Sequence, residues 1–426
     1  MTSIASQFNW VNRDAALLIS ARGLRSFAQG YMALIIAFHF KELGFSFAQL
    51  TVFISAGIAG VAFFTFLIGF IADRAGRRRL LIGFALLAAG GGVALSFVDH
   101  LLALMVVAFF GSLTSGGGGG GESPTQPLVM ASLPDTAPNE KRTELFAIYG
   151  IAARTGTALG TLAAGLPILF QHTFGLSIIE SYKVMFFGLA VFHLMVTLLY
   201  SLLSPAVEGA VTRQKWTNPL RLPSRRRIFT LTGLFSVDTF TTSMVGQTLI
   251  AFWFDDRFGL DLGSLPFIFF LSNILTAISM GVAAKLANKI GLINTMVFTH
   301  IPSSLFFIAA IFAPTAWAAV VFWQVKAFLS QMDVPTKESY TMSVVGPEER
   351  VAMASINMVS RSAFGALGPS ATGFLSSALS LTFPFVGSAV VKIGYDLSLY
   401  AMFRNVKPLE ETRAPEPRST VQEPAD

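Results

Sequence analysis

Twelve long apolar stretches run through the chain, and they restrict its fold more than any other feature. A helix needs about 20 mostly apolar residues to cross the hydrocarbon layer of a bilayer. Open strands cannot cross lipid, and no stretch alternates with the period of a barrel strand. We therefore predict an all-α membrane protein with twelve transmembrane helices. The predicted spans lie near residues 14–40, 49–71, 80–98, 102–131, 144–170, 182–203, 228–254, 265–287, 292–312, 316–342, 353–375 and 383–403.

The composition agrees with a chain that lies in lipid. Hydrophobic residues make up 53% of the sequence and charged residues only 13%, whereas a soluble domain carries about 25% charged residues. The chain has no cysteine, which excludes disulfides and thiolate metal sites.

Basic residues set the expected orientation, because loops on the cytoplasmic side carry an excess of lysine and arginine. RAGRRR (74–79) and RLPSRRR (221–227) fall on the same side of the predicted spans, so we predict that both termini are cytoplasmic. The longest internal connection, 204–227, divides the spans six and six. The domains expected are helical bundles over 1–203 and 228–403, a cytoplasmic linker over 204–227, and a disordered cytoplasmic tail over 404–426.

The two halves of the sequence repeat one another in order. GLRS (23–26) matches GLFS (233–236), AFHF (37–40) matches AFWF (251–254), and RTELFAIYGIAARTGTALG (142–160) matches RVAMASINMVSRSAFGALG (350–368). The pentapeptide ESPTQ (122–126) likewise matches DVPTK (333–337). Since both halves start on the same side, the repeat is parallel. It predicts a pseudo-two-fold axis along the membrane normal.

The loop GFIADRAGRRR after the second span resembles the corresponding loop of the major facilitator superfamily. The matching residues are Gly69, Asp73, Arg74, Gly76, Arg77 and Arg78. The resemblance implies two bundles that rock around a central cavity, with spans 1, 4, 7 and 10 lining it and spans 3, 6, 9 and 12 outside. It also makes these loop residues a candidate gate, with Asp73 controlling the conformational switch. Met332 to Thr336 are similar to a bacterial branch that carries Met-Asp-Val-Pro-Thr.

Charged residues inside the spans are candidate functional residues, because a central charge costs about 2.5–3.5 kcal/mol on insertion scales and must pair or face water. The candidates for substrate binding or coupling are Arg22, Arg25, Glu122, Arg154, Asp238, Lys326, Asp333 and Arg361. Lys392 and Asp396 are four residues apart on one helix face, so we interpret them as a structural ion pair.

Arg25 and Asp238 occupy nearly corresponding places in the first and seventh spans, near mid-membrane by their distance along the helix. A bridge between them across the two halves is one interpretation. Such a pair would either clamp the bundles together or exchange for substrate or proton, and the sequence leaves both open.

Glu122 and Asp333 begin the repeated pentapeptide, two residues before a proline that removes an amide donor and loosens the helix. Each acid has an arginine at a similar depth, Arg154 or Arg361. A carboxylate that pairs with arginine when ionised and releases it when protonated can couple protons. The alternative is a hinge with a fixed ion pair.

Cofactor and enzyme chemistry are not expected. His193 and His300 fall at positions where packing dominates, and no two histidines have metal-ligand spacing. The six glycines at 116–121 lack the lysine of a nucleotide-binding loop, and there is no catalytic Ser/His/Asp arrangement. We predict no metal, no cofactor and no enzyme activity.

These features predict a secondary transporter of a small solute that works by alternating access, with proton-coupled efflux preferred on the resemblance. Its partners would be the solute, protons and the lipid bilayer, with no nucleic acid, and the protein would be a monomer in a bacterial inner membrane. An importer of an organic anion or sugar, a metal or metalloid exporter, and a membrane sensor that transports nothing stay open as alternatives.

Overall fold

The structure is a computed structural model that describes residues 10–111, 113, 123–138, 141–208, 223–343, 345 and 349–405. All regular secondary structure in these ranges is helical, so the predicted all-α class is confirmed. The first half of the chain contains α1 (Arg13–Glu42), α2 (Phe47–Ala75), α3 (Arg77–Leu95), α4 (Leu101–Gly111), α5 (Gln126–Ser132), η2 (Leu133–Thr136), α6 (Arg142–Ala163), α7 (Leu166–Phe174), α8 (Ile178–Ser201) and η4 (Pro205–Glu208).

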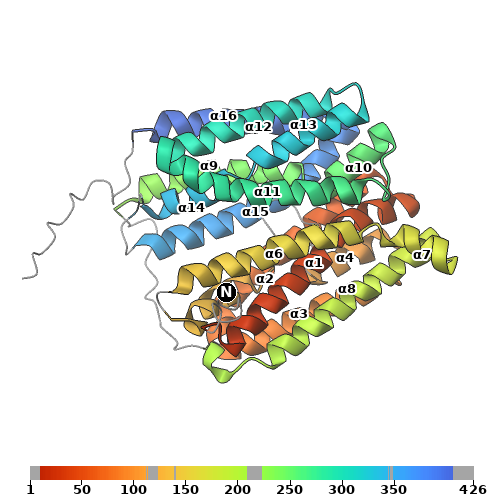
Figure 1. The fold of residues 1–426 in the computed structure, drawn as a ribbon, viewed down its shortest axis with the longest axis horizontal. Coiled ribbons are helices and arrows are strands. Elements are labelled where there is room, and N and C mark those ends of the chain that lie inside the picture. Colours follow the sequence, from red (N-terminus) through yellow and green to blue (C-terminus); the bar gives the residue numbers. More distant parts are fainter. Residues whose placement is uncertain are drawn as a thin grey trace, which may run out of the picture.

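The second half of the chain contains the remaining helices, and Figure 1 shows them (green to blue) grouped apart from those of the first half (red to yellow). They are α9 (Arg225–Met244), α10 (Gln247–Phe258), α11 (Leu265–Ile290), α12 (Leu292–Ile311), α13 (Ala316–Leu329), α14 (Asp333–Ser343), α15 (Arg350–Ala378) and α16 (Thr382–Phe403).

Several spans that we predicted as continuous helices are divided. The span near 228–254 breaks at Val245 and Gly246, between α9 and α10. The span near 316–342 breaks between α13 and α14, immediately before the pentapeptide, so Pro335 stands in the first turn of α14, where its missing amide is tolerated. The span near 144–170 divides into α6 and α7, and Pro167 starts α7. The predicted span near 102–131 contributes α4 and α5, and most residues between them lie outside the described part.

Six helical stretches of the described residues are long and apolar enough to cross a membrane. They are Phe47–Gly69, Arg77–Leu95, Ile178–Ser201, Arg225–Phe258, Leu265–Ala287 and Leu292–Ile311; the apolar helices Leu101–Gly111 and Ala316–Leu329 are shorter. Large apolar side chains such as Phe97, Leu198 and Phe298 are exposed on the outside. A surface of this kind suits contact with lipid rather than with water.

Equivalent helices of the two halves pack in the same way. In the first half α1 packs on α6, α3 on α8 and α2 on α4; in the second half α9 packs on α15, α12 on α16 and α11 on α13. Across the halves, α2 lies against α15 and α6 against α11. The sequence repeat therefore has a counterpart in the packing.

Two glycines at equivalent places allow the same close helix contact in each half. A Cβ atom on Gly160 of α6 would lie 1.9 Å from the carbonyl oxygen of Phe27, and one on Gly368 of α15 would lie 2.6 Å from that of Phe240. Both approaches are too close for any side chain, so glycine lets α6 meet α1 and α15 meet α9 in the same manner.

Among the described residues, the apolar core that both halves share lies at one end of the molecule. One cluster of buried apolar residues contains side chains from both halves, among them Phe40, Phe53, Phe254 and Trp323. At the other end the first half has its own cluster around Leu18 and Tyr200, and the second half has its own around Leu231 and Leu399.

Polar contacts between the halves lie at the same end as the shared core. Lys41 Nζ lies 2.5 Å from Asp255 Oδ2, Thr248 donates a hydrogen bond of 2.6 Å to the carbonyl of Ala33, and Ser370 Oγ lies 2.7 Å from Ser55 Oγ. The halves are thus joined at the end where α1 meets α10 and have separate cores at the opposite end.

Candidate functional site

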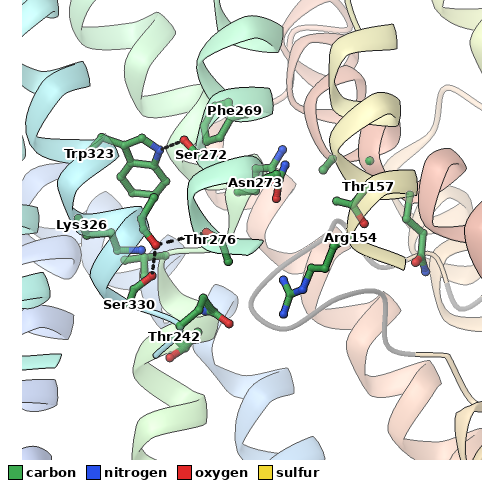
Figure 2. Close-up of a pocket in the computed structure, with 17 residues that line it drawn as sticks. Arg154, Thr157, Thr242, Phe269, Ser272, Asn273, Thr276, Trp323, Lys326 and Ser330 are labelled. Carbon is green, nitrogen blue, oxygen red and sulfur yellow. Dashed lines mark hydrogen bonds between the residues drawn. The ribbon is translucent and has the colours of Figure 1, made fainter. Parts of the chain in front are cut away.

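A cavity of about 120 Å³ lies between the two halves of the chain, and we call it the central cavity. Helices α1 and α6 of the first half line it together with α9, α10, α11 and α13 of the second half (Figure 2). Most of its lining residues are polar, and they include side-chain amides and hydroxyls. The lining residues are Gln29, Gly30, Ala33, Arg154, Thr157, Thr242, Val245, Gln247, Phe269, Ser272, Asn273, Thr276, Trp323, Lys326, Ala327, Ser330 and Gln331.

Two cations, Arg154 of the first half and Lys326 of the second, lie on opposite sides of the cavity (Figure 2). The ammonium of Lys326 lies 4.5 Å from the centre of the Trp323 ring, a cation–π contact. The Trp323 indole N–H in turn donates a 3.0 Å hydrogen bond to Ser272 Oγ, so the ring is fixed. No carboxylate of the described residues lies within 4 Å of either cation, and none lines the cavity.

Six ionisable side chains form a continuous chain inside the second half, which we call the ion chain. Its members are Lys392, Asp238, Lys337, Asp333, His300 and Asp396. They come from α9, α12, α14 and α16, and its acids and histidine are buried.

Lysines join the carboxylates at one end of the ion chain. Lys337 Nζ lies 2.5 Å from Asp238 Oδ2 and 2.7 Å from Asp333 Oδ2, and Lys392 Nζ lies 3.0 Å from Asp238 Oδ1. Lys392 also donates a 3.1 Å hydrogen bond to Thr242 Oγ1. Because Thr242 lines the central cavity, the ion chain reaches the cavity wall.

A histidine joins the carboxylates at the other end. His300 Nε2 lies 3.0 Å from Asp333 Oδ1, and His300 Nδ1 lies 3.2 Å from Asp396 Oδ1. Both ring nitrogens therefore face carboxylate oxygens. A neutral imidazole has only one N–H, and its second nitrogen is an acceptor. Only the protonated ring donates to both neighbours.

The first half carries arginines where the second half carries this chain. Arg25 donates hydrogen bonds of 3.3 Å to Thr125 Oγ1 and 3.1 Å to Gln126 Oε1. Arg22 donates to the same amide oxygen at 3.3 Å and lies 5.5 Å from the centre of the Tyr149 ring. Glu122, the predicted acid of this half, lies outside the described residues.

The bridge that we considered between Arg25 and Asp238 is not formed. Each residue bonds instead to the last residue of the pentapeptide in its own half, Arg25 to Gln126 and Asp238 to Lys337. Equal depth along the membrane normal does not bring two side chains together when each faces a different helix of its own half.

Two other expected ion pairs, Asp333 with Arg361 and Lys392 with Asp396, are not formed either; each residue has a different partner. Arg361 Nε donates a 3.0 Å hydrogen bond to Thr239 Oγ1, and Asp333 pairs with Lys337 and His300. Lys392 and Asp396 share a helix face, yet each reaches across to another helix, to Asp238 and His300. Helical spacing alone identified neither partner.

The loop with the superfamily-like motif is closed by an acid that the sequence did not single out. Gly76 has φ of 85° between α2 and α3, a conformation that favours glycine. The backbone N–H groups of Arg77 and Arg78 donate to Glu208 at 2.6 and 3.2 Å, so a carboxylate sits at the start of α3.

The side chains of the motif contribute further contacts. The Arg78 guanidinium donates to the carbonyl of Ser201, and that of Arg77 to Ser132 Oγ at 3.5 Å. Gly69 and Arg74 lie in α2, Arg74 in its last turn. The side chain of Asp73 lies outside the described part, so its gating role stays a prediction.

His300 and Lys337 are the site residues that sequence reasoning missed. His300 was interpreted as a packing residue, because a lone histidine in an apolar helix carries no pattern. Lys337 did carry a signal, since it ends the repeated pentapeptide. Among the described residues, no group of three or more His, Cys, Asp or Glu side chains is arranged to hold a metal ion.

Comparison with known families decides the class of this architecture. The model of the Major Facilitator Superfamily matches residues 18–332. The chain belongs to the Major Facilitator Superfamily. It is therefore a multi-pass membrane protein of a transporter family whose members handle small solutes, as the loop motif predicted.

Relatives of the chain cover nearly its whole length. An uncharacterised membrane protein of Saccharomyces cerevisiae, YJR124C, is 21% identical over 94% of this chain and 96% of its own. A bacterial homologue of the human lysosomal transporter Spinster, in an inward-facing and occupied conformation, is 16% identical with a TM-score of 0.73, over 94% of this chain and 98% of its own. A POT family transporter in complex with 5-aminolevulinic acid is 16% identical with a TM-score of 0.70, over 91% and 96%.

Proposed function

We propose that this protein is a secondary transporter that moves a small solute through the central cavity by alternating access of its two halves. The observation that carries the proposal is the placement of a polar cavity between halves that are joined at one end only. A binding site that touches both halves changes when they rock, and separate cores leave each half able to move as a body.

The proposal includes the arrangement in the membrane. Twelve spans in two six-helix bundles, 1–203 and 228–403, form a monomer with both termini and the 204–227 linker in the cytoplasm. The sequence repeat and the matched packing of the halves support it. The membrane is the cytoplasmic membrane of a bacterium, a placement that rests on the resemblance at Met332 to Thr336. The joined end is then the outer one.

Protons drive transport in this proposal, and the ion chain is where they bind. Within the six side chains three carboxylates face two lysines, so the six are neutral together only when one more proton is bound. The Arg361 guanidinium lies beyond Lys337 and is held by Thr239. Buried net charge is unfavourable. His300 has a carboxylate oxygen at each ring nitrogen, which makes it the group that holds this proton, with Asp333 as its ionised partner.

The surroundings of His300 determine when the proton leaves. The ionisable groups around the ring are Asp333 and Lys337 of α14, Lys392, Tyr395 and Asp396 of α16, Lys326 of α13, and, beyond them, Asp238 of α9 and Arg361 of α15. A small cavity of about 40 Å³ lined by Lys392, Lys326 and Thr242 adjoins the central cavity. Proton release and solute binding therefore act on neighbouring groups.

The direction that we propose is efflux, which rests on the resemblance alone; import through the same cavity is the alternative. Proteoliposomes separate the two. With the protein inserted in one orientation, a proton gradient directed into the cytoplasmic-side compartment drives the solute out of that compartment if the protein is an antiporter. Accumulation in that compartment under the same gradient would identify a symporter.

A disulfide across the halves tests alternating access directly, because the chain has no cysteine of its own. Ser55→Cys with Ser370→Cys replaces two hydroxyls that lie 2.7 Å apart, a separation that suits a disulfide. Oxidation should lock the joined end and abolish solute flux, and reduction should restore it. Each single cysteine variant is the control.

Full flux through the oxidised double variant, with the crosslink verified on a gel, would contradict alternating access. Loss of flux in a single cysteine variant would instead point to a local effect of the substitution, which the reduced double variant would reproduce.

A further inference from the structure

The described residues that line the central cavity carry positive charge, and no carboxylate among them balances it. Arg154 and Lys326 are its charged lining residues, and both are cations. A cation in the low-dielectric interior is unfavourable unless it is paired or reaches water. A bound anion would balance the positive charge of these two residues.

Arg154 and Lys326 are partly buried, and the fully buried cations of the described part differ from them in having partners. Arg25 donates to Thr125 and Gln126, and Lys337 pairs with two carboxylates. Arg154 has no hydrogen bond or ion pair with any described residue, although its guanidinium carries five donors. Lys326 rests on the Trp323 ring instead of a carboxylate.

The same wall offers an apolar face beside the two cations. Phe269 and Trp323 both line the cavity, with ring centres 5.8 Å apart in an edge-to-face arrangement. The Trp323 indole N–H is already bonded to Ser272. Both rings are largely buried, so they add a small apolar patch to the wall. An apolar group of a solute can pack there while its charged end reaches the cations.

We propose that the transported solute is a small organic anion, whose carboxylate, phosphate or sulfonate lies between Arg154 and Lys326 and whose apolar part packs against Trp323 and Phe269. This inference rests on the proposed function, since it names the solute of the same cavity. Arg154 supplies a planar fork for two anion oxygens, and Lys326 supplies a point charge from the other half.

The arrangement also explains how the solute acts on conformation. Arg154 belongs to α6 of the first half and Lys326 to α13 of the second. An anion that both residues contact attracts both halves to itself. Solute binding then favours the state in which the halves close around the cavity.

Thermal unfolding of the purified full chain tests the inference, because a ligand that binds the folded state raises the apparent stability. The probes are a defined panel of size-matched compounds in three sets: organic anions such as benzoate, phenyl phosphate and benzenesulfonate; neutral analogues such as benzamide; and cations such as benzylamine. Inorganic phosphate and chloride form a fourth set. We expect the compounds that raise the melting temperature to come from the organic anions.

Variants of the two cations locate the site. Arg154→Gln and Lys326→Gln should each weaken binding of the stabilising anion about 10- to 100-fold, the loss expected for one charge-assisted contact. Arg154→Lys should recover part of the affinity. Arg257→Gln is the matched control, since Arg257 lies on α10 away from the cavity and donates to the carbonyl of Ala313; it should bind like the unchanged protein.

Several results would overturn the inference. Stabilisation by the neutral or cationic set alone, by inorganic anions alone, or by no compound of the panel would each contradict an organic anion as the solute. An anion whose affinity survives both glutamine variants binds elsewhere and contradicts the site. Flux of a neutral or cationic stabiliser through proteoliposomes, blocked by the Ser55→Cys/Ser370→Cys crosslink, would leave the transporter standing and reject only the anion.

Discussion

The two copies of the pentapeptide occupy equivalent places and perform different chemistry. In the first half Gln126 accepts hydrogen bonds from Arg22 and Arg25. In the second half the matching residue is Lys337, which donates to Asp238. In both copies the fifth residue of the motif bonds to a charged side chain on the first long helix of its half. The two helices that the bond joins are equivalent in the two halves. The fifth residue of the motif is the acceptor in the first half and the donor in the second.

The two copies of the pentapeptide differ in the ionisable groups around them. Neutral partners hold the arginines of the first half, so no described group there gains or loses a proton in making these bonds. The second half instead places carboxylates, lysines and a histidine in one buried chain. We propose a structural role for the first copy and proton coupling for the second.

Removing the central carboxylate of the ion chain should give the largest loss of stability. Asp238→Asn leaves Lys337 and Lys392 without the charge that both contact, and breaking a buried ion pair costs about 3–5 kcal/mol. Arg25→Gln, at the nearly corresponding place in the first half, should cost about 1–3 kcal/mol because its partners are neutral. Unfolding in detergent measures both. Equal losses would remove the distinction between the halves.

A double-mutant cycle should separate real partners from residues of merely equal depth. Asp238→Asn and Lys337→Gln should be coupled by about 1–3 kcal/mol, because the side chains touch. Arg25→Gln and Asp238→Asn should be additive within about 0.5 kcal/mol. Coupling in the second cycle as large as in the first would restore the bridge across the halves that the sequence first indicated.

A smaller effect should be the same in both halves. Gly160→Ala and Gly368→Ala each push a methyl group against a carbonyl, of Phe27 and of Phe240. Overpacking of this kind costs about 1–3 kcal/mol. Comparable falls in melting temperature for the two variants are expected. A loss confined to one of them would show that the packing of the halves is less alike than their sequences.

The ion pair at the joined end should contribute least to stability. Lys41 is half exposed and meets Asp255 across the halves, and an exposed pair is worth about 0–1 kcal/mol. Lys41→Gln should therefore leave the melting temperature nearly unchanged. It should still shift the balance of states toward opening of that end, which spin labels on α1 and α10 can measure. A fall in stability as large as that of Gly160→Ala would be inconsistent with a solvent-screened contact.

The sequence predicted what depends on local pattern. The apolar stretches predicted the helical class, and the matches at 142–160 and 350–368 predicted equivalent helices in the two halves. The structure adds that these helices pack through Gly160 and Gly368 in the same way. The turn at Gly76 was also visible, from its motif. These features depend on residue type at one place in the chain.

Partners far apart in the sequence could not be predicted in the same way. His300 meets Asp333 and Asp396, which lie on two other helices, and a single histidine gives no hint of either. The Arg25–Asp238 interpretation used depth, which fixes a position along the membrane normal but not the direction of a side chain around it. Glu208, which closes the motif loop, is an ordinary acid in a connecting segment.

The most direct test of the account is pH-driven transport in proteoliposomes, with the stabilising anion as solute. Asp333→Asn removes the charge that faces His300 Nε2 and should abolish accumulation against a gradient while leaving solute exchange intact. Glu122→Gln, the same change in the first copy of the pentapeptide, should keep pH-driven accumulation. Accumulation that persists in Asp333→Asn, or that is lost only in Glu122→Gln, would contradict proton coupling in the second half.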